Sequence, residues 1–104
     1  MKDGWISAFD AHSRLEEHGE LQPAFVIRPR AADGVVVGRA RLLIWGRERR
    51  EDCEIPPEFW AKLIGQIWRA GDFSTMVRHD DCRAYGVTFL EADIEAMLPR
   101  RKGL

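Results

Sequence analysis

The sequence contains no asparagine, only five serine and threonine residues, and three lysines against thirteen arginines. Without asparagine it offers no acceptor for N-linked glycans. Its two cysteines, Cys53 and Cys82, are too few for a disulfide framework. We therefore expect two free thiols in a reducing cytoplasm rather than a Cys53–Cys82 bridge.

Long apolar segments are also missing. Leu42–Trp45 is among the longest uninterrupted apolar runs, whereas a membrane-spanning helix needs about 20 residues. The segment Met1–Trp5 lacks the apolar stretch of a secretory signal. The sequence therefore predicts a cytoplasmic protein that does not enter a membrane.

What the chain does have is the composition of a folded domain. It has 104 residues, of which 45% are hydrophobic and 32% charged, and its formal net charge is −1. Disordered chains are less hydrophobic and further from neutrality. This length is also typical of one domain, so residues 1–104 are predicted to form a single unit.

Three segments have helical signals. Ser7 and Asp10 resemble a capping box that opens a helix ending near Gly19. A second helix, residues 57–70, is indicated by proline in its first turn and by apolar residues at helical spacing, namely Trp60, Leu63, Ile64, Ile67 and Trp68. A third covers Leu90–Leu98 and precedes a basic tail, residues 99–104, which is expected to be flexible.

Strand signals lie between these helices. Val35–Trp45 alternates in the way a half-buried strand does, and Phe73–Val77 and Tyr85–Phe89 are expected as short strands. Two interpretations stay open for residues 21–34, a helix starting at Pro23 or a strand over Phe25–Arg28. The strand is favoured because the helix would enclose a second proline, Pro29. The predicted fold class is α+β, a small single domain with about three helices and a short antiparallel sheet.

The charge distribution gives the strongest functional signal. Residues 28–50 contain seven arginines against two acidic residues. If the strand stayed extended beyond Trp45, one face would carry Arg39, Arg41, Trp45, Arg47 and Arg49, with Arg50 beside them. Guanidinium groups bind phosphates and an indole can pack on a sugar or base, so this set predicts a nucleic-acid interface. An acidic protein would use the same surface, and nearby glutamates could instead make it an ordinary solvated hairpin.

The alternative is an interface on the predicted helix 57–70. Its apolar face (Trp60, Leu63, Ile64, Ile67 and Trp68) is typical of a domain core. For so small a domain the face is broad and aromatic, and it could serve a homodimer or an adaptor that binds another protein.

Catalytic and metal-binding patterns are weak. Cys53, His79 and Cys82 could contribute to a zinc site, but no Cys-x₂-Cys pair is present. Neither Ser13 nor Ser74 has the flanking glycines of a nucleophile elbow, and the sequence contains no glycine-rich phosphate loop. We therefore expect a non-catalytic binding module with no metal and no cofactor.

Two segments resemble parts of excisionase-type and winged helix-turn-helix domains. Ile6–Ala11 is similar to the start of their first helix, and Gly86–Leu98 to their closing strand and helix. Ile55–Trp60 and Trp68–Phe73 also look like segments of small bacterial proteins without an assigned activity. The resemblance implies a regulatory role on DNA and no catalytic residue. Pro29 would interrupt a recognition helix. The resemblance therefore implies contacts from the Arg39–Arg50 region to the DNA backbone rather than reading of the major groove.

Overall fold

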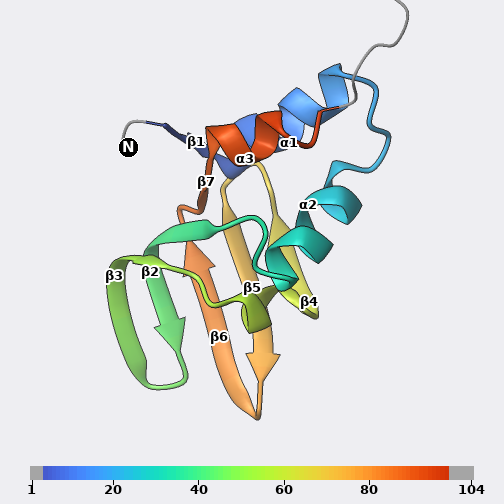
Figure 1. Cartoon of the computed structure of the whole chain (residues 1–104). Coiled ribbons are helices and arrows are strands. Elements are labelled where there is room, and N and C mark those ends of the chain that lie inside the picture. Colours follow the sequence, from blue (N-terminus) through green and yellow to red (C-terminus); the bar gives the residue numbers. More distant parts are fainter. Residues whose placement is uncertain (1–3, 99–104) are drawn as a thin grey trace, which may run out of the picture.

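A computed structural model describes residues 4–98, and a β-sheet dominates it (Figure 1). In chain order the elements are β1 (Trp5–Ser7), α1 (Ala8–Glu17), α2 (Pro23–Ala32), β2 (Gly38–Trp45), β3 (Glu48–Glu54), the 3-10 helix η1 (Pro57–Trp60), β4 (Leu63–Ile67), β5 (Asp72–Val77), β6 (Asp80–Tyr85), β7 (Thr88–Leu90) and α3 (Glu91–Glu95). The predicted tail, residues 99–104, lies outside the described residues.

The predicted α+β class with a short sheet is wrong. Seven antiparallel strands form one sheet in the order β1-β7-β2-β6-β5-β4, and β3 pairs with β2 on its other side. The largely charged segment Glu48–Glu54 forms β3, and residues 63–67 of the predicted helix 57–70 form β4. The three helices are short, so the sheet organises the domain.

The strands β6 and β7 behave as one long strand with a break at Gly86 and Val87. Both pair with β2 in a single register, from Trp45↔Cys82 to Gly38↔Phe89. At the break, the Val87 N–H donates to the Gly71 carbonyl at 2.9 Å, and the Val87 carbonyl accepts from Ala8 N–H at 3.0 Å. One residue therefore ties the β4–β5 turn and the start of α1 to the middle of the sheet.

The first predicted helix is confirmed. The Ser7 side chain accepts a hydrogen bond from the backbone N–H of Asp10 at 3.0 Å, which satisfies an otherwise orphan donor of α1. Gly19, with φ +95°, follows the helix. Arg14 then joins α1 to α3 through ion pairs with Glu91 and Glu95, and Figure 1 shows the two helices together at one end of the sheet.

The predicted strand Phe25–Arg28 is wrong, because these residues lie in α2. Pro23 occupies the first turn of α2, where its missing N–H costs nothing. Pro23, Ile27 and Ala31 are all buried, so one helical face with a four-residue spacing packs on the core. Pro29 lies inside the helix on its exposed side. Burial of that face therefore outweighs the cost of an internal proline.

The predicted helix 57–70 is also wrong. Only η1 is helical, and the chain then runs extended through β4, where Gly65 disfavours a helix and two β-branched isoleucines favour a strand. The five apolar side chains do not share a face. Trp60 is 1% exposed, Leu63 and Trp68 are half-buried, and Ile64 and Ile67 point to solvent.

An aromatic cluster centred on Trp60 fills the core. Its ring centroid lies 5.4 Å from Phe59, 5.2 Å from Phe73 and 5.6 Å from Phe89. Trp68 packs edge-on against Phe73 at 4.9 Å and so closes one side of the cluster. Edge-to-face and tilted pairs at these distances are favourable beyond the area they bury.

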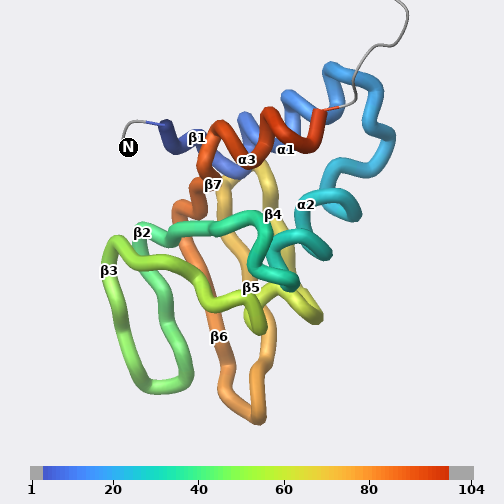
Figure 2. Tube along the Cα trace, viewed as in Figure 1, coloured from blue at the N-terminus to red at the C-terminus, as the bar shows by residue number. Residues whose placement is uncertain are grey.

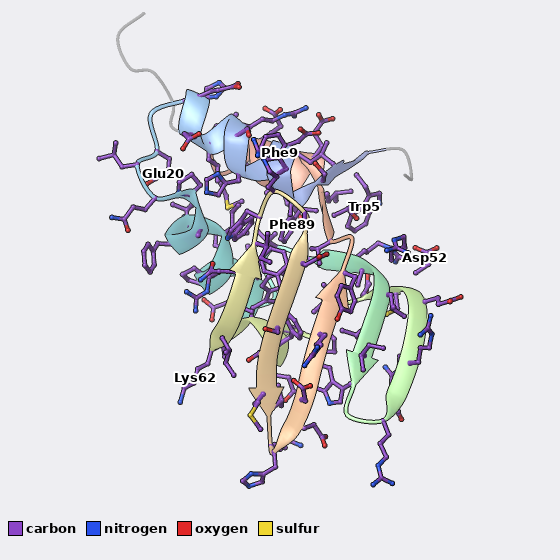
Figure 3. All side chains as sticks on the ribbon, turned by 180° about the vertical axis from the view of Figure 1, so that it is seen from behind. Trp5, Phe9, Glu20, Asp52, Lys62 and Phe89 are labelled. Carbon is purple, nitrogen blue, oxygen red and sulfur yellow. The ribbon has the colours of Figure 1, made fainter. Side chains whose placement is uncertain are left out.

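Two hairpins project from this core. The β2–β3 and β5–β6 hairpins run in the same direction, away from α1 and α3 (Figure 2). Figure 3 shows α2 beside β4, partly behind the sheet, where it packs against η1 and α1. The turns of the two hairpins lie far from α1 and α3, whereas the start of β2 pairs with β7, which in turn pairs with β1.

Candidate anion-binding cleft

An open cleft of about 610 Å³ lies at the start of β2, where five parts of the chain meet. Its lining residues are Trp5 and Ser7 of β1, residues 39–41 of β2, Asp52 of β3, residues 69–71 of the β4–β5 turn, and residues 86–88 between β6 and β7. Three arginines and a single carboxylate belong to this set. Figure 3 places Trp5 and Asp52 at the same edge of the molecule.

The alternation of buried and exposed residues in β2 changes where this strand lines the cleft. Ala40 and Leu43 are both buried, so the inward positions pass from even to odd numbers around Arg41. The residues beside Arg41 on the neighbouring strands, Asp52 and Gly86, both have positive φ, +46° and +62°. A Cβ on Gly86 would lie 3.0 Å from the Arg41 Cβ, so glycine lets the Arg41 stem lie against the sheet.

Gly71 permits an equally close approach on the other side of the cleft. It has φ +75°, and a Cβ there would lie 3.0 Å from the backbone nitrogen of Val87. Gly71→Ala should therefore cost about 2–3 kcal/mol of unfolding free energy, combining left-handed strain with overpacking. Gly19→Ala is the matched control, because Gly19 has φ +95° but no atom within 4 Å. It should cost only about 1 kcal/mol. Urea denaturation measures both, and equal losses would contradict the close approach.

Arg39 is held in place by several partners. Its Nη2 donates to the Asp52 carbonyl at 2.8 Å and lies 3.2 Å from Asp52 Oδ1. The guanidinium carbon also lies 5.6 Å from the centre of the Trp5 ring, within the range of a cation–π contact. Asp52 therefore neutralises Arg39, and Arg39 positions the indole at the cleft wall.

Within residues 4–98, no carboxylate neutralises Arg41 or Arg69. Neither forms an ion pair or a hydrogen bond with any residue between 4 and 98. Both side chains are exposed, and Arg69 is positioned by the Phe9 ring, whose centre is 5.8 Å from its guanidinium carbon. Guanidinium groups with free donors in a shared cleft form a natural site for a phosphate or carboxylate.

The arginines beyond Trp45 lie elsewhere. The chain turns at Gly46 and Arg47, so the predicted single face of Arg39, Arg41, Trp45, Arg47 and Arg49 does not form. Arg49 pairs across the ladder with Ile44 and therefore faces away from Trp45. The Trp45 ring packs 6.4 Å from Phe59 at the core. Of the predicted nucleic-acid residues, the structure brings only Arg39 and Arg41 into the cleft.

Carboxylates on the same strand accompany two hairpin arginines. Arg50 Nη2 lies 2.7 Å from Glu48 Oε2, and Arg49 Nη2 lies 3.9 Å from Glu51 Oε1. These pairs are exposed and add little stability, but they reduce the local positive charge. Arg47, in the turn, has no ion-pair partner within the described part of the chain. The positive potential of the hairpin is therefore weaker than its seven-arginine segment suggests.

Sequence reasoning missed Trp5 and Arg69. Trp5 belongs to a three-residue strand, and Arg69 lies in a turn that was predicted to be helical. They join the site only because β1 pairs with β7 and because Val87 binds Gly71. No spacing in the sequence signals such a contact.

The cysteines form no chemical centre. Both thiols are free, and burial raises the pKa of Cys53 and of Cys82, although Arg50 and Arg39 partly oppose the change at Cys53. An activated thiolate requires the opposite shift. Across residues 4–98 no group of three His, Cys, Asp or Glu side chains is arranged to hold a metal ion, so Cys53, His79 and Cys82 do not combine.

Comparison with known proteins matches the chain to no family model, no curated protein and no solved structure. The resemblance to winged helix-turn-helix domains therefore depends on the quoted residues alone. Among the helices described for residues 4–98, none is both long enough and apolar enough to cross a membrane.

Proposed function

We propose that the protein is a non-catalytic module that binds single-stranded nucleic acid in this cleft. The observation that carries the proposal is the pair of uncompensated guanidinium groups, Arg41 and Arg69, in one cleft with the Trp5 indole. In this arrangement Arg41 and Arg69 bind backbone phosphates, and Trp5 supplies a surface for an adjacent base. A nucleic-acid ligand also agrees with the cytoplasmic location that the sequence predicts.

The shape of the cleft favours a single strand over a duplex. In a duplex the bases are stacked inside the helix, so an indole in a recess cannot reach their faces. An unpaired strand can place a phosphate and its neighbouring base in the same recess. The formal net charge of the chain is −1, so it lacks the overall basic character that drives non-specific duplex binding.

Fluorescence anisotropy with a short labelled single-stranded RNA, titrated with salt, tests the proposal. Neutralising two or three phosphates predicts a log–log slope of about −1.4 to −2, or roughly ten-fold weaker binding between 50 and 200 mM salt. The matched DNA duplex should bind more weakly at every salt concentration. Absence of RNA binding at low salt would refute the proposal. Binding of polyglutamate in place of RNA would assign the cleft to an acidic protein.

The alternative adaptor or homodimer surface on helix 57–70 is not supported as first formulated. That helix does not form, and Trp60 belongs to the core. Of the five predicted interface residues, Ile64 and Ile67 alone are exposed, and they belong to a strand at the sheet edge.

A further inference from the structure

The edges of the sheet differ sharply in charge. Six of the seven residues of β3 are charged, and an edge of this kind resists pairing with another strand. The edge strand β4 reads Leu-Ile-Gly-Gln-Ile and contains no charged residue. The third edge, β1, has only three residues. The chain therefore protects one long edge and leaves the other without charge.

Hydrogen-bonding groups of β4 are available on its outer side. Its backbone pairs with β5, and the Ile67 carbonyl also accepts from Gly71 N–H at 2.9 Å. No further backbone hydrogen bond is made by residues 63–67 within the described chain. Unpaired strand groups of this kind are completed when another strand is added.

Apolar side chains accompany these backbone groups. Ile64 is 71% exposed and Ile67 is 59% exposed. The β4–β5 register shifts between Leu63 and Gly65, so Ile64 is the extra residue of a bulge. A strand laid along β4 would place its own side chains beside both isoleucines and shield part of their apolar surface from water.

We propose that β4 pairs antiparallel with β4 of a second copy of this chain, which joins two sheets across a two-fold axis. The β3 edge is excluded as a partner, because it would set charged side chains beside an apolar strand. An uncharged strand is best matched by another uncharged edge, and β4 is the one long edge of this type in the described chain. Such an isologous contact uses up both edges, so association stops at the dimer. This inference does not depend on the nucleic-acid cleft.

Sedimentation equilibrium over a range of concentrations tests the pairing. The wild-type protein should approach twice its 12.0 kDa chain mass, and the double variant Ile64→Lys, Ile67→Lys should raise the dimer dissociation constant at least 100-fold. Met76→Lys is the control, because Met76 is 53% exposed but belongs to the inner strand β5. It should leave the dimer unchanged.

Two results would overturn the inference: a wild-type monomer at every concentration, or a dimer that the double lysine variant leaves intact. Circular dichroism establishes whether the variant is folded. If it is not, amide exchange of wild-type residues 63–67 decides, because pairing predicts stronger protection at high protein concentration than at low. Equal protection at both would reject the β4 interface.

Discussion

Trp60→Ala should cost about 3–5 kcal/mol of unfolding free energy, the largest stability loss expected from any single side chain of the domain. The indole is almost completely buried and contacts three other aromatic rings. Its removal leaves a cavity between α2, η1 and the sheet, and these elements cannot move close enough together to fill it. Since domains are stable by only about 5–15 kcal/mol, much of the variant should be unfolded at low denaturant.

Urea denaturation followed by far-ultraviolet circular dichroism measures this loss against two matched variants. Trp68→Ala should have an intermediate effect, because Trp68 is half-buried and its Nε1–H donates to Gln66 Oε1 at 3.0 Å. At a protein concentration low enough for the chain to be monomeric, Ile64→Ala should change stability by less than about 0.5 kcal/mol, as exposed sites usually do. A surface helix over residues 57–70 would predict similar losses for all three, so equal values would contradict the strand β4.

Local signals in the sequence were sufficient where the chemistry is local. The Ser7 cap and Gly19 define α1 without help from the rest of the chain. The alternation predicted over Val35–Trp45 likewise locates β2, although the buried positions pass from even to odd numbers around Arg41. In α1 the donor and the acceptor of the capping bond are three residues apart. In β2 the residues of the two faces are neighbours in the sequence.

Elsewhere, tertiary packing overrode the local pattern. Trp60, Leu63, Ile64, Ile67 and Trp68 have helical spacing, yet Trp60 is drawn into the aromatic core and β4 pairs with β5. For Phe25–Arg28, burial of Ile27 on a helical face outweighs the cost of Pro29. A single sequence gives no measure of these distant contacts.

Only part of the candidate site could be predicted from the sequence. Arg39 and Arg41 belong to a clear strand, but Trp5 and Arg69 reach them only through sheet pairing. The sequence also overstated the hairpin charge, because β3 places Glu48 beside Arg50 and Glu51 near Arg49. Two residues apart on one strand, such side chains lie on the same face, which an arginine count does not reveal.

The double variant Arg41→Gln, Arg69→Gln should weaken single-stranded RNA binding about 100-fold or more. Hydrogen bonds to charged groups contribute about 1.5–3 kcal/mol each, and a ten-fold change in affinity corresponds to about 1.4 kcal/mol. Glutamine keeps much of the side-chain stem and removes only the charge. Loss of two phosphate contacts should also reduce the magnitude of the salt slope by about 1.4, since each contact contributes about 0.7. Salt-titrated anisotropy measures both quantities.

The double variant Arg49→Gln, Arg50→Gln is the matched control on the β2–β3 hairpin. It also removes two positive charges, but from residues outside the cleft. Both arginines lie on β3 outside the cleft and already have carboxylate neighbours, so affinity should fall less than about three-fold, as expected of screened surface charges. Trp5→Ala supplies the third comparison: it should weaken binding by about 1–3 kcal/mol through lost stacking while the salt slope stays unchanged. If the hairpin variant loses as much affinity as the cleft variant, phosphates bind along the arginine strand and not between Arg41 and Arg69. The two surfaces differ in the ion pairs that compensate them, and this comparison makes that difference measurable.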